Sequence, residues 1–230
     1  MERRKLHAGI DIGSTTTKIV VMNPASDEIL YSNYTRHKAR QVESVERCLK
    51  QLKERFGKDE LCLALTGSGS KNLADQLGIP YVQEVVANSI AIRRKFRNVS
   101  TAIELGGQDA KVLFFKRDPA TGALSVSDMR MNGSCAGGTG AFLDEVASIL
   151  RVPSNELNAL AAQGETVYDI SGRCGVYAKT DIQPLLNQGV SKSNLALSAF
   201  HAVAKQTIGG LAQGLTIKGP VIFEGGPMTF

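Results

Sequence analysis

The chain has 230 residues, of which 43% are hydrophobic and 21% charged, values typical of a soluble globular protein with a sizeable core. No apolar run approaches the roughly 20 residues that cross a bilayer, and the N-terminal segment lacks the apolar stretch of a secretory signal. We therefore expect a cytoplasmic protein without a membrane partner. The net charge of +5 includes a basic run at Arg93, Arg94, Lys95 and Arg97. No aromatic interleaving accompanies this run, so we interpret it as a solvated helix end and expect no nucleic-acid partner.

The first half of the chain alternates between extended and helical segments. Residues 6–13, 18–24 and 28–36 have the pattern of a β-meander. A helix over 42–56 carries its apolar side chains at helical spacing and ends at Gly57. The elements predicted after it are a strand at 61–67, helices at 70–77 and 85–96, and strands at 101–107, 111–117 and 123–130. The last three strands form a second meander, and the whole pattern predicts an α/β fold.

The second half of the chain is mostly helical by its pattern. We expect Pro184 to kink or end the helix in which it lies, because proline lacks the N–H group of a helical residue. The predicted elements are helices at 137–150, 155–162, 176–187 and 195–215, followed by a strand at 219–226.

The turn between the first two strands has the composition of a phosphate-binding loop. Asp11 lies at a strand end and is followed by Gly13 and by four hydroxyl residues at 14–17. Gly13 permits a close approach of the backbone to a ligand, and the N–H groups and hydroxyls of the turn can donate to phosphate oxygens. We expect Asp11 to hold Mg²⁺ through water, because magnesium prefers oxygen ligands and keeps several waters.

Three further glycine clusters follow this loop. Glu104 ends a strand and is followed by the Gly-Gly-Gln-Asp turn at 106–109, which repeats the pattern of the first loop. A third cluster at 137–140 opens a helix, and a fourth at 225–226 ends a strand. One glycine turn is a weak signal, but four in this order favour a site in which two hairpins clamp a polyphosphate and its metal.

In order and spacing, the four segments resemble the phosphate, connecting and adenosine motifs of the acetate and sugar kinase, Hsp70 and actin superfamily. The resemblance implies a ribonuclease H-like α/β fold with ATP or ADP and Mg²⁺ between two lobes, the first over 1–100 and the second over 101–230. This superfamily usually has aspartate where the chain has Glu104. By position, the residues expected to bind nucleotide are Gly13, Ser14, Thr15, Thr16, Lys18, Glu104, Gly106, Gly107, Gln108, Gly138, Gly225 and Gly226.

Hydrolysis of a bound nucleotide needs a group that orients the attacking water. Asp11 and Asp109 are the two candidates for this catalytic role, with Asp11 acting through the metal. Both candidates lie in the predicted phosphate loops.

The four cysteines are too few and too scattered for a disulfide scaffold. Cys135 and Cys174 each lie in a glycine-rich segment just before a predicted helix, where helix N–H groups favour a thiolate. These positions suit a metal–sulfur centre. Two cysteines do not supply the four thiolates of a cubane cluster, but a symmetric dimer does. Cys48 and Cys62 are expected to be core or surface residues.

The segments GIDIGSTTTK, GGQDAK, MNGSCAGGTGAFLD and SGRCGVYAKTDI resemble motifs of the BadF/BadG/BcrA/BcrD ATPase family, which activates 2-hydroxyacyl-CoA dehydratases and benzoyl-CoA reductase-type enzymes. The resemblance implies that Cys135 and Cys174 bind a 4Fe-4S cluster shared in a homodimer, or in an intramolecular pseudo-dimer of two domains. ATP hydrolysis then drives a low-potential electron from ferredoxin or flavodoxin into the dehydratase or reductase component. An anaerobic source follows from such a cluster.

The chain stops at Phe230, where the family continues with another helix and strand. This ending resembles the long, multidomain activases, and we expect a fragment or a first domain of one. Two other functions of the same superfold are alternatives: a small-molecule kinase, and a nucleotide-switched interaction module. Iron content distinguishes the activator from both.

Overall fold

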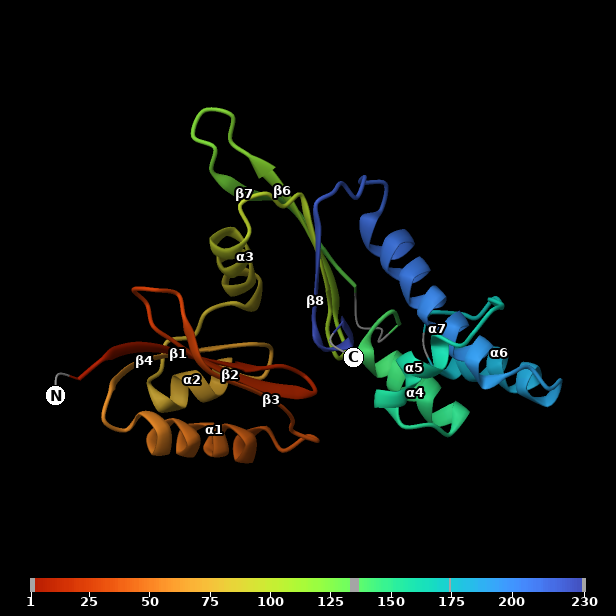
Figure 1. Ribbon diagram of the computed structural model, residues 1–230, viewed down its shortest axis with the longest axis horizontal. Helices are drawn as coiled ribbons and strands as arrows, with labels where there is room; N and C mark the ends of the chain where they lie inside the picture. The colour runs from red at the N-terminus through yellow and green to blue at the C-terminus, as the bar shows by residue number, and fades with distance from the viewer. Residues whose placement is uncertain (1–2, 133–136, 174, 229–230) are drawn as a thin grey trace. The chain divides into compact units, whose positions relative to one another are not determined.

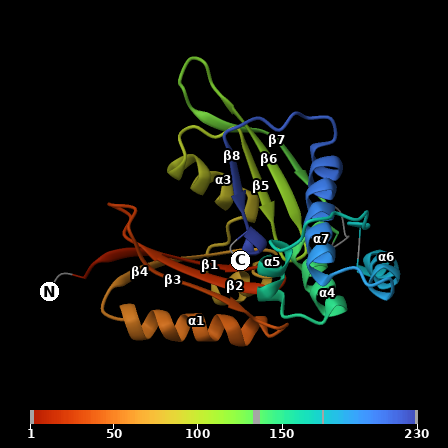
Figure 2. The ribbon, with the colours of Figure 1, turned by 45° about the vertical axis from the view of Figure 1, so that its right-hand side comes forward.

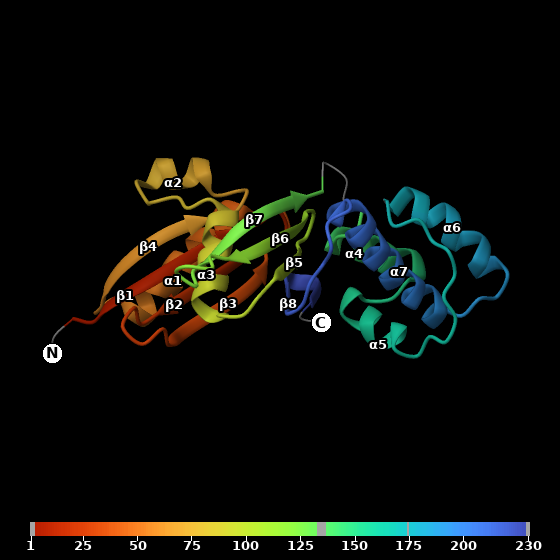
Figure 3. The same cartoon turned by 90° about the horizontal axis from the view of Figure 1, so that it is seen from above.

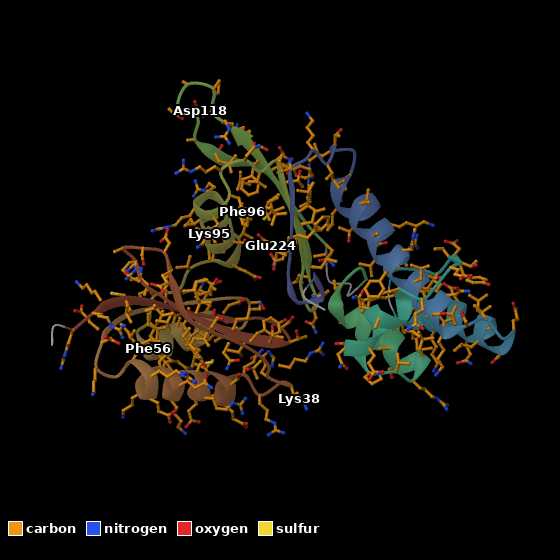
Figure 4. All side chains as sticks on the ribbon, in the orientation of Figure 1. Lys38, Phe56, Lys95, Phe96, Asp118 and Glu224 are labelled. Atoms are coloured by element: carbon orange, nitrogen blue, oxygen red, sulfur yellow. The ribbon has the colours of Figure 1, made fainter. Side chains whose placement is uncertain are left out.

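The structure, a computed structural model, describes residues 3–132, 137–173 and 175–228. The chain forms two compact units, Met1–Lys95 and Phe96–Phe230, and the residues on either side of the division are labelled in Figure 4. Each unit is built on a four-stranded sheet (Figure 1). Within the described ranges, every helix is too short or too polar to cross a membrane.

The first unit is a mixed sheet with strand order β3-β2-β1-β4. Strands β1, β2 and β3 are antiparallel neighbours, which confirms the predicted meander, and β4 runs parallel to β1. The elements are β1 (Lys5–Ile12), β2 (Thr16–Met22), β3 (Ile29–Arg36), α1 (Gln41–Phe56), β4 (Glu60–Thr66), α2 (Lys71–Leu77) and α3 (Glu84–Lys95).

The core of the first unit forms between one face of the sheet and helix α1. Every second residue of β1 is buried, including Leu6 and Ile10, which are 1% and 0% exposed. Leu52 and Phe56 of α1 belong to the same cluster, and Phe56 is labelled in Figure 4. Each such aliphatic side chain contributes about 1.5–3 kcal/mol when fully buried. This core holds the C-terminal end of β1, where the first phosphate loop begins.

Helix α3 ends in the basic run noted in the sequence. Arg93, Arg94 and Lys95 form its last turn, where positive charge complements the helix dipole. The Nε atom of Arg94 donates to Oδ2 of Asp27 at 2.8 Å. This hydrogen bond lowers the pKa of Asp27. The basic run therefore has a structural role at a helix end.

The second unit repeats the sheet of the first, with strand order β7-β6-β5-β8. Strands β5, β6 and β7 are antiparallel neighbours, and β8 runs parallel to β5. Helices α4 to α7 gather on one side of this sheet (Figures 2 and 3). The elements are β5 (Thr101–Leu105), β6 (Ala110–Arg117), β7 (Leu124–Met131), α4 (Gly140–Leu150), η1 (Ser154–Glu156), α5 (Leu157–Ala161), α6 (Gly175–Asn187), α7 (Lys192–Thr207), η2 (Ile208–Ala212), β8 (Val221–Glu224) and η3 (Gly226–Met228).

A single cluster of buried residues joins the sheet of the second unit to its helices. Val112 of β6, Phe142 and Leu150 of α4, and Leu195 of α7 are each at most 1% exposed and belong to this cluster. Strand β6 is buried along its first six residues, as expected for an inner strand. The packing fixes the N-terminus of α4 beside the turn between β5 and β6.

Two expectations about the helices are wrong. Helix α6 continues past Pro184 to Asn187, so this proline does not end it. The predicted helix over 195–215 is α-helical only to Thr207 and then becomes the π-helical segment η2. Two consecutive glycines at 209–210 lie in that segment, and glycine is a poor helix former because its backbone loses much freedom on ordering.

Candidate functional site

An acidic residue near the end of the first strand of each sheet faces a lysine on the next strand. Asp11 pairs in register with Lys18, and Oδ2 of Asp11 lies 2.6 Å from Nζ of Lys18. Glu104 pairs in register with Lys111, and Oε1 of Glu104 lies 3.4 Å from Nζ of Lys111. Acid and lysine are seven residues apart in both hairpins. The repeated sequence pattern is therefore a repeated structure, and Lys111 is a site residue that the sequence reasoning missed.

The two predicted phosphate loops close in the same way. The N–H group of Gly13 donates to the carbonyl oxygen of Thr16 at 2.9 Å. The N–H group of Gly106 donates to the carbonyl oxygen of Asp109 at 2.7 Å. Each loop thus places a glycine immediately before a short turn, at the point where the backbone can approach a ligand most closely.

Asp11 has a second carboxylate oxygen for which the described residues offer no hydrogen-bond partner. Its Oδ1 atom is buried, and so is Oγ1 of Thr66, which also lacks a partner in the described part of the chain. Asp11 and Thr66 are paired in the parallel register of β1 and β4. Buried polar atoms without partners are costly, and they mark places where a ligand or water binds. A free carboxylate oxygen beside a hydroxyl fits a hydrated Mg²⁺ ion.

The equivalent position in the second unit holds another carboxylate. Glu224 ends β8 and pairs with Glu104 in the parallel register of β5 and β8 (Figure 4). Glu224 therefore corresponds to Thr66 of the first unit. The sequence signal for this role was weak, because Glu224 precedes the glycine pair that drew attention instead.

Three of the predicted glycine clusters meet in the second unit. The N–H groups of Gly140 and Ala141, which begin α4, donate to the carbonyl oxygens of Gly106 and Gly107 at 2.9 and 2.8 Å. Gly225 lies against the same loop, because a Cβ atom there would overlap the carbonyl oxygen of Leu105. The first amides of α4 are therefore engaged by the loop and hold it in place.

Two glycines pack against the strand ends that carry the acidic residues. Gly67 follows β4 and Gly225 follows β8, with left-handed φ angles of 96° and 99°. A Cβ atom on Gly67 would lie 2.5 Å from the carbonyl oxygen of Ile12, the residue after Asp11. Gly225 makes the corresponding approach to Leu105. The sequence analysis did not single out Gly67; its signal was a glycine directly after a buried strand, as at Gly225.

Gly67→Ala is expected to lower the free energy of unfolding of the protein by about 3 kcal/mol, because a methyl group would meet the backbone of β1 at a left-handed φ. Chemical denaturation followed by circular dichroism measures this loss. Gly78 is a matched control, since its φ of 64° is also left-handed but no atom lies within 4 Å of the added Cβ. Gly78→Ala should cost only about 1 kcal/mol. Equal losses in both variants would contradict the close packing at Gly67.

The remaining predicted ligands lie in or beside these loops. In the first unit, Ser14 and Thr15 are half-buried in the loop and Thr16 is buried at the start of β2. In the second unit, Gln108 is exposed. Asp11 and Asp109, the two catalytic candidates, belong to different units. The other predicted ligands of the second unit are Gly107, at the second loop, Gly138, just before α4, and Gly226, in η3.

Cys135 and Cys174 lie outside the described residues, but the segments beside them are in contact. A Cβ atom on Gly137 would lie 2.6 Å from the carbonyl oxygen of Gly172. A polar pocket of about 340 Å³ opens at this contact, lined by Asn132, Gly137, Gly138, Arg173, Gln206 and Thr207 among others. Among the described residues, no three His, Cys, Asp or Glu side chains gather as a metal site.

The other two cysteines have structural surroundings. Cys48 is buried in the core of the first unit, and this burial raises the pKa of its thiol. Cys62 is exposed on β4. Both observations agree with the expectation that these are core or surface residues.

A sequence model of the BadF/BadG/BcrA/BcrD ATPase family matches residues 8–229. The chain belongs to this family. Its relatives in the BadF/BadG/BcrA/BcrD ATPase family include the (R)-2-hydroxyglutaryl-CoA dehydratase activating ATPase of Acidaminococcus fermentans, which is 28% identical over 95% of this chain and 81% of the relative. A benzoyl-CoA reductase polypeptide of Thauera aromatica is 27% identical over 84% of this chain and 68% of the relative.

Two solved structures of family members share this fold. Component A of the A. fermentans (R)-2-hydroxyglutaryl-CoA dehydratase superposes with a TM-score of 0.83 and 28% identity, over 96% of this chain and 83% of that one. The activator of the 2-hydroxyisocaproyl-CoA dehydratase from Clostridium difficile, with bound ADPNP, gives a TM-score of 0.82 and 26% identity, over 97% and 81%. The predicted α/β fold of the actin, Hsp70 and sugar-kinase type is thereby confirmed.

Proposed function

We propose that this protein is an ATP-hydrolysing iron–sulfur activator, which drives a low-potential electron into a 2-hydroxyacyl-CoA dehydratase or a benzoyl-CoA reductase-type partner. The observation that carries the proposal is the pair of equivalent hairpins, Asp11 with Lys18 and Glu104 with Lys111, in a chain that matches an activating ATPase family over 8–229. Relatives named as dehydratase activators and as part of a benzoyl-CoA reductase support the choice of partner.

The nucleotide half of the mechanism rests on the two loops. Mg²⁺, when bound, neutralises charge on the phosphate oxygens during transfer to water. Asp11 offers its unpartnered Oδ1 to the waters of that ion, and Lys18, 2.6 Å from Oδ2, adds positive charge beside the phosphates. Gly13 and Gly106 bring the loop backbones close to the ligand. Either Asp11, through the metal, or Asp109 orients the attacking water.

The electron-transfer half of the mechanism rests on two cysteines. Cys135 and Cys174 are the proposed ligands of a 4Fe-4S cluster, which supplies a one-electron carrier when bound. The contact between Gly137 and Gly172 supports this pairing, because each glycine lies two residues from one of the cysteines. Since one chain offers two thiolates for a cluster that takes four, a second copy or a second domain supplies the others. Ferredoxin or flavodoxin is the proposed electron donor.

Anaerobic purification followed by three measurements tests the proposal. We expect Mg²⁺-dependent phosphate release from ATP and about two irons per chain, each with one acid-labile sulfide. We also expect the reduced protein to become oxidised on addition of ATP and the dehydratase component of a relative. A folded chain that binds ATP but holds no iron would contradict the activator. Phosphate transfer to a small hydroxylated substrate in place of water would indicate the kinase alternative.

A further inference from the structure

His37 is a buried residue that contacts the first phosphate loop twice. It follows β3, is 3% exposed, and precedes Lys38, which is labelled in Figure 4. Its ring Nε2 lies 3.0 Å from the carbonyl oxygen of Gly13, and its backbone N–H group donates to the carbonyl oxygen of Thr15 at 3.1 Å. A carbonyl oxygen only accepts hydrogen bonds, so Nε2 carries the hydrogen. His37 therefore holds the loop from one side.

The contact at Gly13 fixes the direction of a peptide group. In a trans peptide the carbonyl of one residue and the N–H group of the next point in opposite directions. Because the carbonyl of Gly13 points at His37, the N–H group of Ser14 points away from His37. The N–H group of Gly13 is also fixed by its bond to Thr16. The orientation of the Ser14 N–H group thus depends on a side chain outside the loop.

The second unit reaches the same arrangement by a different route. Gly106 occupies the position of Gly13, since each donates to a carbonyl three residues further along its loop. The carbonyl of Gly106 accepts from the N–H group of Gly140 at 2.9 Å, at the start of α4. Helix α4 therefore orients the second loop through its main chain, whereas the imidazole of His37 orients the first.

The backbone beside His37 is strained. Lys38 and Ala39 have left-handed φ angles of 49° and 63°, although neither is glycine. Such a conformation costs roughly 1–2 kcal/mol per residue, and it persists where the surrounding structure requires it, often at functional sites. The other ring nitrogen, Nδ1, is buried and has no hydrogen-bond partner among the described residues. Within the same part of the chain, the ring's polar contact is the one with Gly13.

We propose that His37 is a positioning residue for phosphate binding: its Nε2–H group fixes the Gly13–Ser14 peptide so that the Ser14 N–H group faces a phosphate of the bound nucleotide. This inference rests on the proposed nucleotide-binding function of the loop. It assigns to a residue outside the glycine-rich motif the role that a helix N-terminus has in the second unit.

Three substitutions at His37 test the proposal. In His37→Gln the amide nitrogen can reach the place of Nε2, whereas in His37→Asn it reaches the place of Nδ1, which has no partner among the described residues. We expect His37→Asn and His37→Ala to raise the Kd for ATP with Mg²⁺ about tenfold, and His37→Gln to stay within about twofold of the wild type. Isothermal titration calorimetry measures the affinities. His7→Asn, an exposed site on β1, is the control and should change nothing.

Hydrogen exchange of the amides at 13–16 in the nucleotide-free protein gives an independent readout. Exchange should be about tenfold faster in His37→Asn and near the wild-type rate in His37→Gln. If the wild type binds no nucleotide, the proposed function fails, and the exchange rates still show whether His37 holds the loop. Wild-type affinity and exchange in all three variants, or equal losses in His37→Gln and His37→Asn, would overturn the inference.

Discussion

Asp11→Asn is expected to lower the rate of ATP hydrolysis by on the order of 10²–10³-fold while the protein stays folded. Asparagine keeps the shape of the side chain but removes the charge that holds the waters of Mg²⁺. It also removes the anion beside Lys18, whose ammonium group lies 2.6 Å from Oδ2. Phosphate release at saturating ATP and Mg²⁺ measures the effect, and a thermal unfolding curve shows whether the fold is intact.

The surface offers a matched control for the loss of an ion-paired aspartate. Asp59 precedes β4, at the opposite end of this strand from Thr66, and accepts two hydrogen bonds from Arg4 at 2.9 and 2.8 Å. The hydrogen bonding to Arg4 lowers the pKa of Asp59. Asp59→Asn removes this pair without touching the loop, so hydrolysis should keep its wild-type rate. Full activity in Asp11→Asn would exclude the metal role assigned to this carboxylate.

Asp109→Asn, in the second loop, separates the two candidates for orienting water. If Asp109 has this role, its substitution lowers turnover at saturating Mg²⁺ and leaves the affinity for the metal–nucleotide complex unchanged. If Asp11 has the role through the metal, Asp109→Asn affects turnover only weakly. The backbone carbonyl of Asp109 closes its loop in either case, and asparagine preserves that bond.

The strands that carry the phosphate loops were predictable because their burial alternates. In β1 every second residue packs into the core, so the sequence shows a period of two up to the loop. The turn that follows contains the glycine and hydroxyl residues that a phosphate ligand requires. Local sequence therefore indicated both the hairpin and its chemistry, and the structure confirms the hairpin in each unit.

The residues that the sequence analysis missed depend on contacts between distant segments. Thr66 and Glu224 become neighbours of Asp11 and Glu104 only through the parallel pairing of β4 with β1 and of β8 with β5. His37 has no motif around it; its contact with Gly13 arises because β3 returns along β2 and brings the next residue beside the loop. A single sequence does not encode such pairings in local spacing.

Cys135→Ser and Cys174→Ser are each expected to reduce the iron content from about two irons per chain to near zero. The reason is stoichiometric: in a cluster shared by two copies, one substitution per chain removes two of the four thiolates. Iron and acid-labile sulfide, measured after anaerobic purification together with the mass in solution, test this. Cys62→Ser is the matched control, because Cys62 is an exposed thiol on β4, and it should leave the iron content unchanged.

Gly137→Ala tests the same cluster without removing a thiol. The added methyl group would meet the carbonyl oxygen of Gly172, so the segments that precede Cys174 and follow Cys135 must move apart. If the two cysteines act together, this separation lowers the iron content although every cysteine is present. Full iron in Cys135→Ser would contradict the ligand assignment itself. Full iron in Gly137→Ala, together with loss of iron in both serine variants, would retain the ligands but show that this contact does not set their spacing.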